Sequence, residues 1–125
     1  MTTITFNRVI PRLRIFDVDK AKEFYLKFLG FELKWEHRHE ETGPVYMEVS
    51  RGGFSIHLTE HHGDCCPGSS VFVWMNGIDD YHQEISSRDY PFMNPHIEDA
   101  FWDARLMIVI DPFGNTIMFN ESIDR

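Results

Sequence analysis

The two halves of this chain carry the same order of expected secondary-structure elements, and this repetition limits the fold more than any other feature. Each half reads as one helix set among short strands, in the order β-α-β-β-β. An offset of 60 residues places Asp17-Val18-Asp19 on Gly77-Ile78-Asp79, and an offset of 61 places Gly53 on Gly114. Such self-similarity indicates an internal duplication. We therefore expect an α+β fold of two βαβββ modules, whose curved sheets face one another across a concave cleft while each helix covers the outer face of its own sheet.

The first module is expected over about residues 4–60. Residues 4–15 alternate loosely between apolar and polar side chains, which predicts a strand with an edge, a bulge or a bend at Pro11. Asp17 or Asp19 can cap the following helix, and Gly30 ends it. Apolar residues recur on one face of this helix, at Ala21, Phe24, Tyr25, Phe28 and Leu29. Three short strands are then predicted at 31–37, 45–50 and 54–59.

The second module is expected over about residues 69–122, after a polar linker at about 61–68. It contains a strand at 71–75, a helix at 78–87 and a weak strand near His96. Two apolar runs, 106–110 and 116–119, then flank the segment Asp111-Pro112-Phe113-Gly114-Asn115. Asp at the first position, Pro at the second and Gly at the fourth favour a type I turn, so these runs form a hairpin.

Composition bounds the function. With 125 residues the chain is one domain, and its net charge of −8 argues against binding to a nucleic-acid backbone while it suits a cationic ligand. No apolar run approaches the roughly 20 residues that span a bilayer, and the N-terminus lacks a signal-peptide block, so we expect a cytoplasmic protein that does not bind membranes. The two cysteines, Cys65 and Cys66, are adjacent and do not form a disulfide framework.

Four segments resemble the glyoxalase/bleomycin resistance/dioxygenase (vicinal oxygen chelate) superfamily. They are Val73-Trp74-Met75-Asn76-Gly77-Ile78-Asp79, Trp102-Asp103-Ala104-Arg105, Asp111-Pro112-Phe113-Gly114-Asn115 and residues 19–31. The chain looks most similar to the bleomycin resistance branch, and the resemblance covers nearly its whole length. It implies a homodimer with two ligand clefts.

The resemblance also locates the place where metal-dependent members hold their ion. The corresponding positions here are Ile10, His57, Ser70 and Met118, with Met118 where a metal-binding Glu would stand. A divalent site of this class needs three or four His or carboxylate ligands, so we expect no metal, no cofactor and no catalytic residue. The resemblance then implies a dimer that sequesters a bleomycin-like drug without altering it.

Aromatic side chains at matching places predict the ligand site, because stacking and cation–π contacts supply affinity without catalytic groups. The predicted set is Trp35, His57, Phe72, Trp74, Trp102, Arg105 and Met118. Each has a structural alternative. His57 can be a hydrogen-bonded sheet residue, Trp35 a core or dimer-packing residue and Trp102 a hydrophobic lid. Arg105 can orient an anionic group or pair with an acidic neighbour.

Two other functions stay open at this point. One is a metal-dependent lyase, isomerase or dioxygenase with an atypical site, in which His57 acts with His61, His62 or His96. The run from His61 to Cys66 matches no established metal-ligand spacing, which weighs against it. The other is an interaction module without a pocket, which would be favoured if Trp35 and Trp102 were packed core residues.

Overall fold

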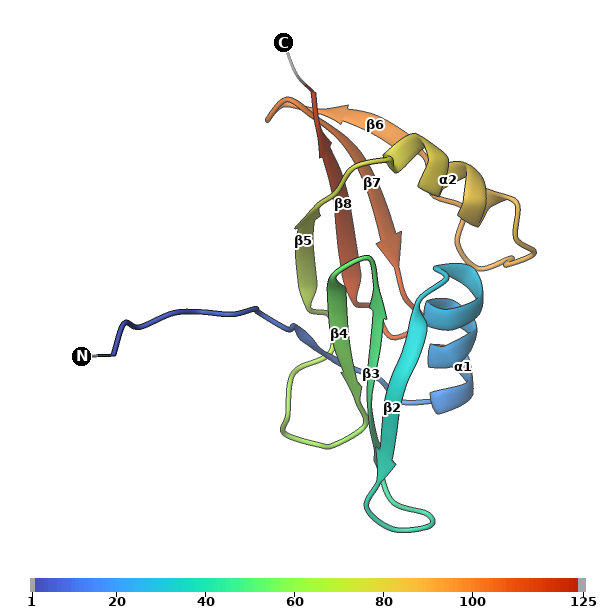
Figure 1. Cartoon of the computed structure of the whole chain (residues 1–125). Helices are drawn as coiled ribbons and strands as arrows, with labels where there is room; N and C mark the ends of the chain where they lie inside the picture. The colour runs from blue at the N-terminus through green and yellow to red at the C-terminus, as the bar shows by residue number, and fades with distance from the viewer. Residues whose placement is uncertain (1, 124–125) are drawn as a thin grey trace.

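The computed structural model describes residues 2–123 and consists of two modules joined by a loop (Figure 1). The first module contains β1 (Arg12–Arg14), α1 (Val18–Lys22), a π-helical segment η1 (Glu23–Phe28), β2 (Glu32–Arg38), β3 (Val45–Arg51) and β4 (Phe54–Thr59). The second contains β5 (Ser70–Trp74), α2 (Ile78–Ser86), β6 (Ile97–Ala100), β7 (Ala104–Ile110) and β8 (Thr116–Ser122). The order βαβββ therefore occurs twice, as predicted.

Both sheets have the same topology. The first sheet has the strand order β1-β4-β3-β2 and the second has the order β5-β8-β7-β6. In each, the first strand of the module pairs in parallel with the last, and the other pairs are antiparallel. Arg12 lies opposite His57, and Phe72 lies opposite Met118 at the equivalent place in the second sheet. This equivalence of register confirms the α+β fold class of paired βαβββ modules.

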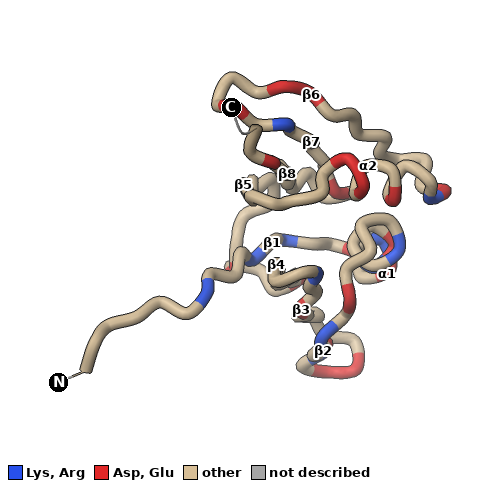
Figure 2. The backbone as a smooth tube through the Cα atoms, turned by 45° about the horizontal axis from the view of Figure 1, so that its top comes forward, with Lys and Arg blue, Asp and Glu red and all other residues tan. Residues whose placement is uncertain are grey.

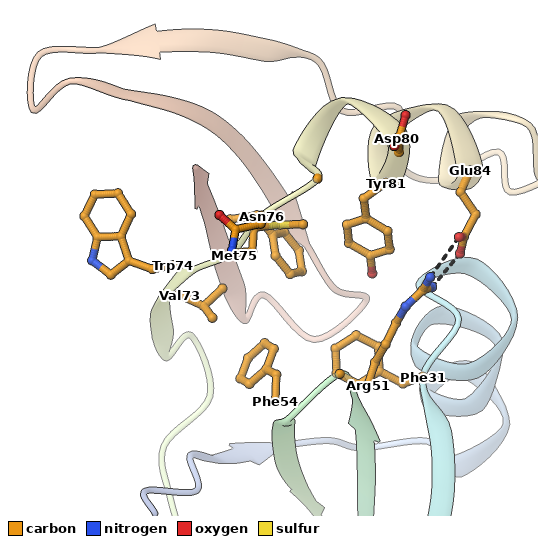
Figure 3. Close-up of a pocket in the computed structure, with 13 residues that line it drawn as sticks. Phe31, Arg51, Phe54, Val73, Trp74, Met75, Asn76, Asp80, Tyr81 and Glu84 are labelled. Carbon is orange, nitrogen blue, oxygen red and sulfur yellow. Dashed lines mark hydrogen bonds and ion pairs between the residues drawn. The ribbon is translucent and has the colours of Figure 1, made fainter. Parts of the chain in front are cut away.

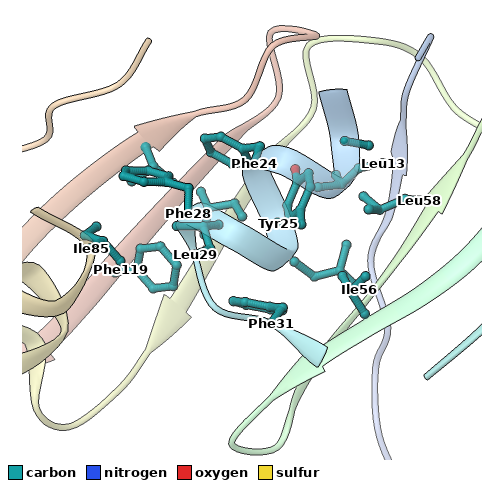
Figure 4. Packing of buried hydrophobic residues seen from close by; sticks show 14 of the residues in the cluster. Leu13, Phe24, Tyr25, Phe28, Leu29, Phe31, Ile56, Leu58, Ile85 and Phe119 are labelled. Carbon is teal, nitrogen blue, oxygen red and sulfur yellow. The ribbon is translucent and has the colours of Figure 1, made fainter. Parts of the chain in front are cut away.

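One continuous hydrophobic core joins the modules. Both helices lie on the same side of the molecule and cover one face of the sheets (Figure 1). Ile56 and Leu58 of β4, Phe24 and Phe28 of η1, and Phe119 of β8 belong to one cluster of buried residues (Figure 4). All five apolar residues predicted on the first helix are buried, which confirms the stripe: Ala21, Phe24, Tyr25, Phe28 and Leu29.

The first helix differs from the prediction in its winding. Asp17 caps it, with its carboxylate accepting a hydrogen bond from the backbone N–H of Lys20 at 2.9 Å. The α-helix ends at Lys22, and residues 23–28 continue as a π-helix. The backbone N–H of Leu29 accordingly donates to the carbonyl of Phe24, five residues earlier, at 2.9 Å. Hydrophobic periodicity marks which residues are buried but does not separate these two windings.

The N-terminal strand is much shorter than predicted. Only Arg12–Arg14 of residues 4–15 pair with β4, because Pro11 carries no backbone N–H and no strand of residues 2–123 lies beside the segment before it. Residues 2–10 leave the body as an extended arm (Figures 1 and 2). Its apolar side chains are open to solvent, with Ile4 83%, Phe6 92% and Val9 89% exposed.

The closing hairpin has the turn predicted at residues 111–114. The backbone N–H of Gly114 donates to the carbonyl of Asp111 at 3.2 Å, and the Asp111 carboxylate accepts from the backbone N–H of Phe113 and of Asn115. Gly114 has a φ of 88°, the left-handed region that favours glycine. No helix within residues 2–123 is long and apolar enough to cross a membrane.

Candidate functional site

Each sheet has one face against the helices and one that faces away from them. Residues opposite one another in neighbouring strands share a face. The register therefore places five side chains together on the uncovered face of the first sheet: Arg12, Trp35, Tyr46, Glu48 and His57. We refer to these residues as the polar face.

A chain of hydrogen bonds runs across the polar face. The Arg12 Nε–H donates to the Tyr46 hydroxyl at 3.1 Å, the hydroxyl bonds His57 Nδ1 at 2.7 Å, and His57 Nε2 bonds Glu48 Oε1 at 2.8 Å. A carboxylate only accepts, so we assign the proton of His57 to Nε2, and Nδ1 then accepts from Tyr46. Every group in the chain is satisfied by this assignment. Both ring nitrogens of His57 are engaged, as its structural alternative predicts.

Trp35 lies on this network as an exposed platform. Its ring is parallel to that of Tyr46, with 5.7 Å between centroids and 5° between planes, and it meets His57 edge-on at 5.3 Å. The side chain is 42% exposed. Trp35 is therefore not a packed core residue, which removes one of the two conditions that would favour a module without a pocket.

The uncovered face of the second sheet is aromatic. Phe72 and Trp74 of β5 lie 5.3 Å apart between centroids, and Trp102, in the turn before β7, lies 5.8 Å from Phe72. Met118 stands opposite Phe72 on β8. We refer to Phe72, Trp74, Trp102 and Met118 as the aromatic face. Phe72 is 48% exposed and Trp74 is 56% exposed, so solvent reaches large ring surfaces here.

A buried amide fixes Trp102 on that face. The indole Nε1–H of Trp102 donates to Asn120 Oδ1 at 2.9 Å, and Asn120 is fully buried within β8. The indole is half-buried. This hydrogen bond orients the ring against the sheet and leaves its outer surface beside Phe72.

Arg105 lies apart from the other six predicted residues. It alternates along β7 with Ala104 and Leu106, so it shares the helix-covered face with Met107. There its Nη2 pairs with the Asp79 carboxylate of α2 at 2.6 Å. The structure thus places Arg105 as a link between α2 and its sheet, the second of the two roles considered for it.

Sequence reasoning missed Tyr46, Glu48 and Asn120. A signal for the first two was present, because Tyr46 and Glu48 alternate with Val45, Met47 and Val49 in β3. An acidic residue in such a strand faces away from the core unless it is paired. That alternation gives the face, whereas the partner of Glu48 follows only from the register of β3 against β4.

The donor set does not fit the metal site of the superfamily. Ile10 precedes β1 and Ser70 begins β5, and neither side chain is a ligand that divalent ions prefer. His57 has both ring nitrogens engaged in hydrogen bonds. Within residues 2–123, no group of three or more His, Cys, Asp or Glu side chains is placed to hold a metal ion.

The side chains of the loop after β4 hold the loop against the sheet and, within residues 2–123, do not form a metal site. Asp64 accepts from the Thr59 hydroxyl at 2.8 Å and pairs with Arg12 at 3.0 Å, so it closes the loop onto the first sheet. These contacts lower the pKa of Asp64, with the Thr59 hydrogen bond as the largest cause. Burial raises the pKa of the neighbouring Cys65 thiol, which disfavours the nucleophilic thiolate.

A cavity of about 540 Å³ lies between the modules (Figure 3). The β3–β4 hairpin, with Arg51 and Phe54, forms one wall, and β5 with α2 forms the other. Arg51 crosses it to make two bonds to the Glu84 carboxylate, at 2.5 and 2.8 Å. Of the seven predicted ligand residues, only Trp74 lines this cavity. The cavity is therefore distinct from the polar face.

Paired βαβββ modules, each with a helix-covered and an uncovered sheet face, are the architecture of the vicinal oxygen chelate class. A family model described as "Glyoxalase superfamily protein" matches residues 1–125. Bleomycin resistance proteins of Geobacillus stearothermophilus and Staphylococcus aureus are each 30% identical over 132 residues, covering 91% of this chain and 96% of theirs. The chain therefore belongs to the glyoxalase superfamily and, within it, to the family of the bleomycin resistance proteins.

Solved structures share the fold. An antibiotic binding protein from Streptomyces sp. CB03234 matches with a TM-score of 0.73 at 21% identity, covering 96% of this chain and 99% of that one. The bleomycin-binding protein of bleomycin-producing Streptomyces verticillus, solved with copper(II)-bleomycin, matches with a TM-score of 0.69 at 23% identity, covering 98% and 100%.

Proposed function

We propose that this protein sequesters a planar, cationic antibiotic or similar small molecule without altering it. The observation that carries this proposal is the aromatic face, where Phe72 and Trp74 expose about half of their surfaces beside Trp102. Exposed rings of this kind bind flat ligands by stacking and attract cations to their π faces. The names of the bleomycin resistance relatives support a drug of that class.

The proposed ligand residues come from both faces. Trp35 and His57 belong to the polar face, and Phe72, Trp74, Trp102 and Met118 form the aromatic face. Arg105 is left out, because its guanidinium pairs with Asp79 on the helix-covered side. Hydrogen-bonding groups on one sheet and rings on the other suit a ligand with a polar part and a flat aromatic part.

A homodimer belongs to the same proposal. The arm of residues 2–10 exposes three large apolar side chains, and a second copy of the chain would remove them from water. Sedimentation at micromolar concentration tests this. We expect a dimer for the full chain and a shift toward monomer for Ile4→Ser combined with Phe6→Ser. A full chain that sediments as a monomer would contradict the dimer. The cytoplasmic location stays a prediction.

Ligand binding is tested by titrating metal-free and copper-loaded bleomycin while tryptophan fluorescence is followed. We expect saturable quenching, and we expect Trp35→Phe and Trp102→Phe each to weaken binding by up to about tenfold, since one aromatic stack contributes roughly 0.5–1.5 kcal/mol. Arg105→Lys serves as a control that changes affinity little. No response to either form at high micromolar concentration would rule out the drug-specific proposal.

A further inference from the structure

We propose that Glu48 is the anchor for the cationic nitrogen of the ligand, and that Arg8 of the N-terminal arm occupies this position until a ligand displaces it. The inference rests on the proposed function and assigns its cation to one carboxylate. Glu48 lies in the middle of β3, on the polar face, and is only 8% exposed.

The Glu48 carboxylate has bonding capacity left over. The hydrogen bond that it accepts within residues 2–123 goes to Oε1, from His57 at 2.8 Å. A carboxylate has about four acceptor positions, and a largely buried one gains more from an added donor than an exposed one does. His57 holds the group in place through Oε1, and no hydrogen bond within residues 2–123 uses Oε2, which therefore remains available to a donor from the ligand.

Arg8 shows which chemistry this position accepts. Its Nη2 lies 4.0 Å from Glu48 Oε1, which is within ion-pair distance but too long for a hydrogen bond. The Arg8 side chain is 64% exposed, against 11% for that of Glu48. A planar cation on an exposed arm therefore already approaches the anchor, through a contact so weak that a ligand can replace it at little cost.

The surroundings specify the rest of the ligand. Trp35 stands directly opposite Glu48 in the pairing of β2 with β3, and its side chain is 42% exposed on the same face. The nearby Arg12 charge is balanced by Asp64 at 3.0 Å, so it opposes an incoming cation only weakly. The site therefore suits an amine, amidine or guanidinium group attached to a flat ring that stacks on Trp35.

Two matched probes test the anchor: proflavine, a planar cation, and acridine, its neutral three-ring counterpart at mildly alkaline pH. Calorimetric titration of Glu48→Gln should show proflavine binding weakened about tenfold or more, because one charge-assisted hydrogen bond is lost, and acridine binding changed less than about twofold. Glu36→Gln is the control, since Glu36 lies on β2 but pairs with Lys22 on the opposite face.

Because Arg8 belongs to the arm proposed to form the dimer, sedimentation of Arg8→Ala first checks that it keeps the wild-type oligomeric state. This variant then tests the displacement separately from Glu48. We expect it to tighten proflavine binding about threefold, to leave acridine unchanged, and to have no effect in a Glu48→Gln background. Unchanged proflavine affinity in Glu48→Gln would overturn the anchor, and unchanged affinity in Arg8→Ala would overturn the displacement by Arg8. Either result would leave the proposed function intact. Failure of both probes to bind the wild-type protein would overturn both proposals.

Discussion

At the scale of single residues, Arg51 links the two modules through contacts with Glu84 and Tyr81. Its guanidinium makes two bonds to Glu84, donates to the carbonyl of Leu29 at 3.2 Å and lies 4.9 Å from the centre of the Tyr81 ring. Glu84 also pairs with Arg88 at 2.9 Å. One side chain from the β3–β4 hairpin is thereby fixed against α2, which sets the spacing between the two walls of the cavity.

Gly30 is required beside this ion pair. Its φ is 76°, and a Cβ added there would lie 2.5 Å from Arg51 Nη1 and 2.9 Å from Arg88 Nη1. Gly30→Ala should therefore lower the free energy of unfolding by about 1–3 kcal/mol, through backbone strain and displacement of Arg51. Gly52→Ala is the matched control, because Gly52 also has a positive φ but no atom within 4 Å of the added Cβ. If urea denaturation showed equal losses of unfolding free energy in the two variants, the contact with Arg51 would contribute nothing to the cost of Gly30→Ala.

The Glu84 ion pairs make stability depend on pH. The Arg51 hydrogen bond, together with both guanidinium charges, lowers the pKa of Glu84 from 4.5 to about 2. A carboxyl whose pKa is lower in the folded state stabilises the protein above pH 4.5 and loses that contribution as pH falls toward 2. We expect Glu84→Gln to cost about 1 kcal/mol near neutral pH, after allowance for solvent screening, and progressively less in acid. A cost that is constant from neutral to acid pH would contradict this.

The residues of the two uncovered faces differ in how far the sequence determines their positions. Alternation places Phe72 and Trp74 on one face of their strand. It would place Trp35 beside Leu33 on the core face, but a β-bulge between these two residues moves Trp35 to the uncovered face. The place of Glu48 in the polar face could not be predicted, because it depends on Glu48 lying between Trp35 and His57 across two strand pairings. The register of one strand against another depends on tertiary packing.

At the scale of elements, the first helix connects the core of its own module to the closing hairpin of the other. The Tyr25 hydroxyl, at the start of η1, donates to Asp111 Oδ2 at 2.7 Å. Both residues are buried, and Asn115 Nδ2 donates to the same oxygen at 2.9 Å. Burial, together with the Asp111 charge, raises the pKa of Tyr25 well above its usual value of 10, so the hydroxyl stays protonated and donates.

Removing that hydroxyl should weaken the link between the modules. We expect Tyr25→Phe to lower the free energy of unfolding by about 1–2 kcal/mol, because the buried Asp111 carboxylate loses one of its donors. Tyr90→Phe is the comparison, since the half-buried Tyr90 packs on Phe28 at 4.6 Å but its hydroxyl makes no hydrogen bond within residues 2–123. If chemical denaturation showed equal losses of unfolding free energy in the two variants, the hydrogen bond from Tyr25 to Asp111 would contribute nothing to stability.

Local pattern predicted the elements better than their winding or pairing. The helix at 78–87 was located to within a residue, because Ile78, Tyr81 and Ile85 recur at helical spacing and all are buried. The π-helical winding of residues 23–28 does not follow from the sequence, because hydrophobic spacing does not distinguish it from an α-helix. The strand at 4–15 was overextended, because alternation identifies an extended segment but not whether a neighbour pairs with it.

At the scale of the whole molecule, the repeated βαβββ order gives two similar sheets with different uncovered surfaces. One presents a hydrogen-bonded network around His57, and its counterpart presents rings around Met118. The helix-covered sides remain joined in a single core that contains residues of both modules, such as Ile56 and Phe119. The surfaces can therefore diverge without loss of the common scaffold, while the shared core makes the modules interdependent in stability.

That interdependence predicts that both modules unfold in one transition. Trp35 reports on the first module, and Trp74 and Trp102 report on the second. We compare Trp35→Phe with the double variant Trp74→Phe/Trp102→Phe, so that each retains reporters in only one module. Within each variant, the urea transition followed by fluorescence should coincide with that followed by far-UV circular dichroism, because neither sheet keeps a complete core once the other unfolds. A fluorescence transition that precedes or follows the circular dichroism transition in either variant would mean that the modules unfold separately despite the contacts of Tyr25 and Arg51.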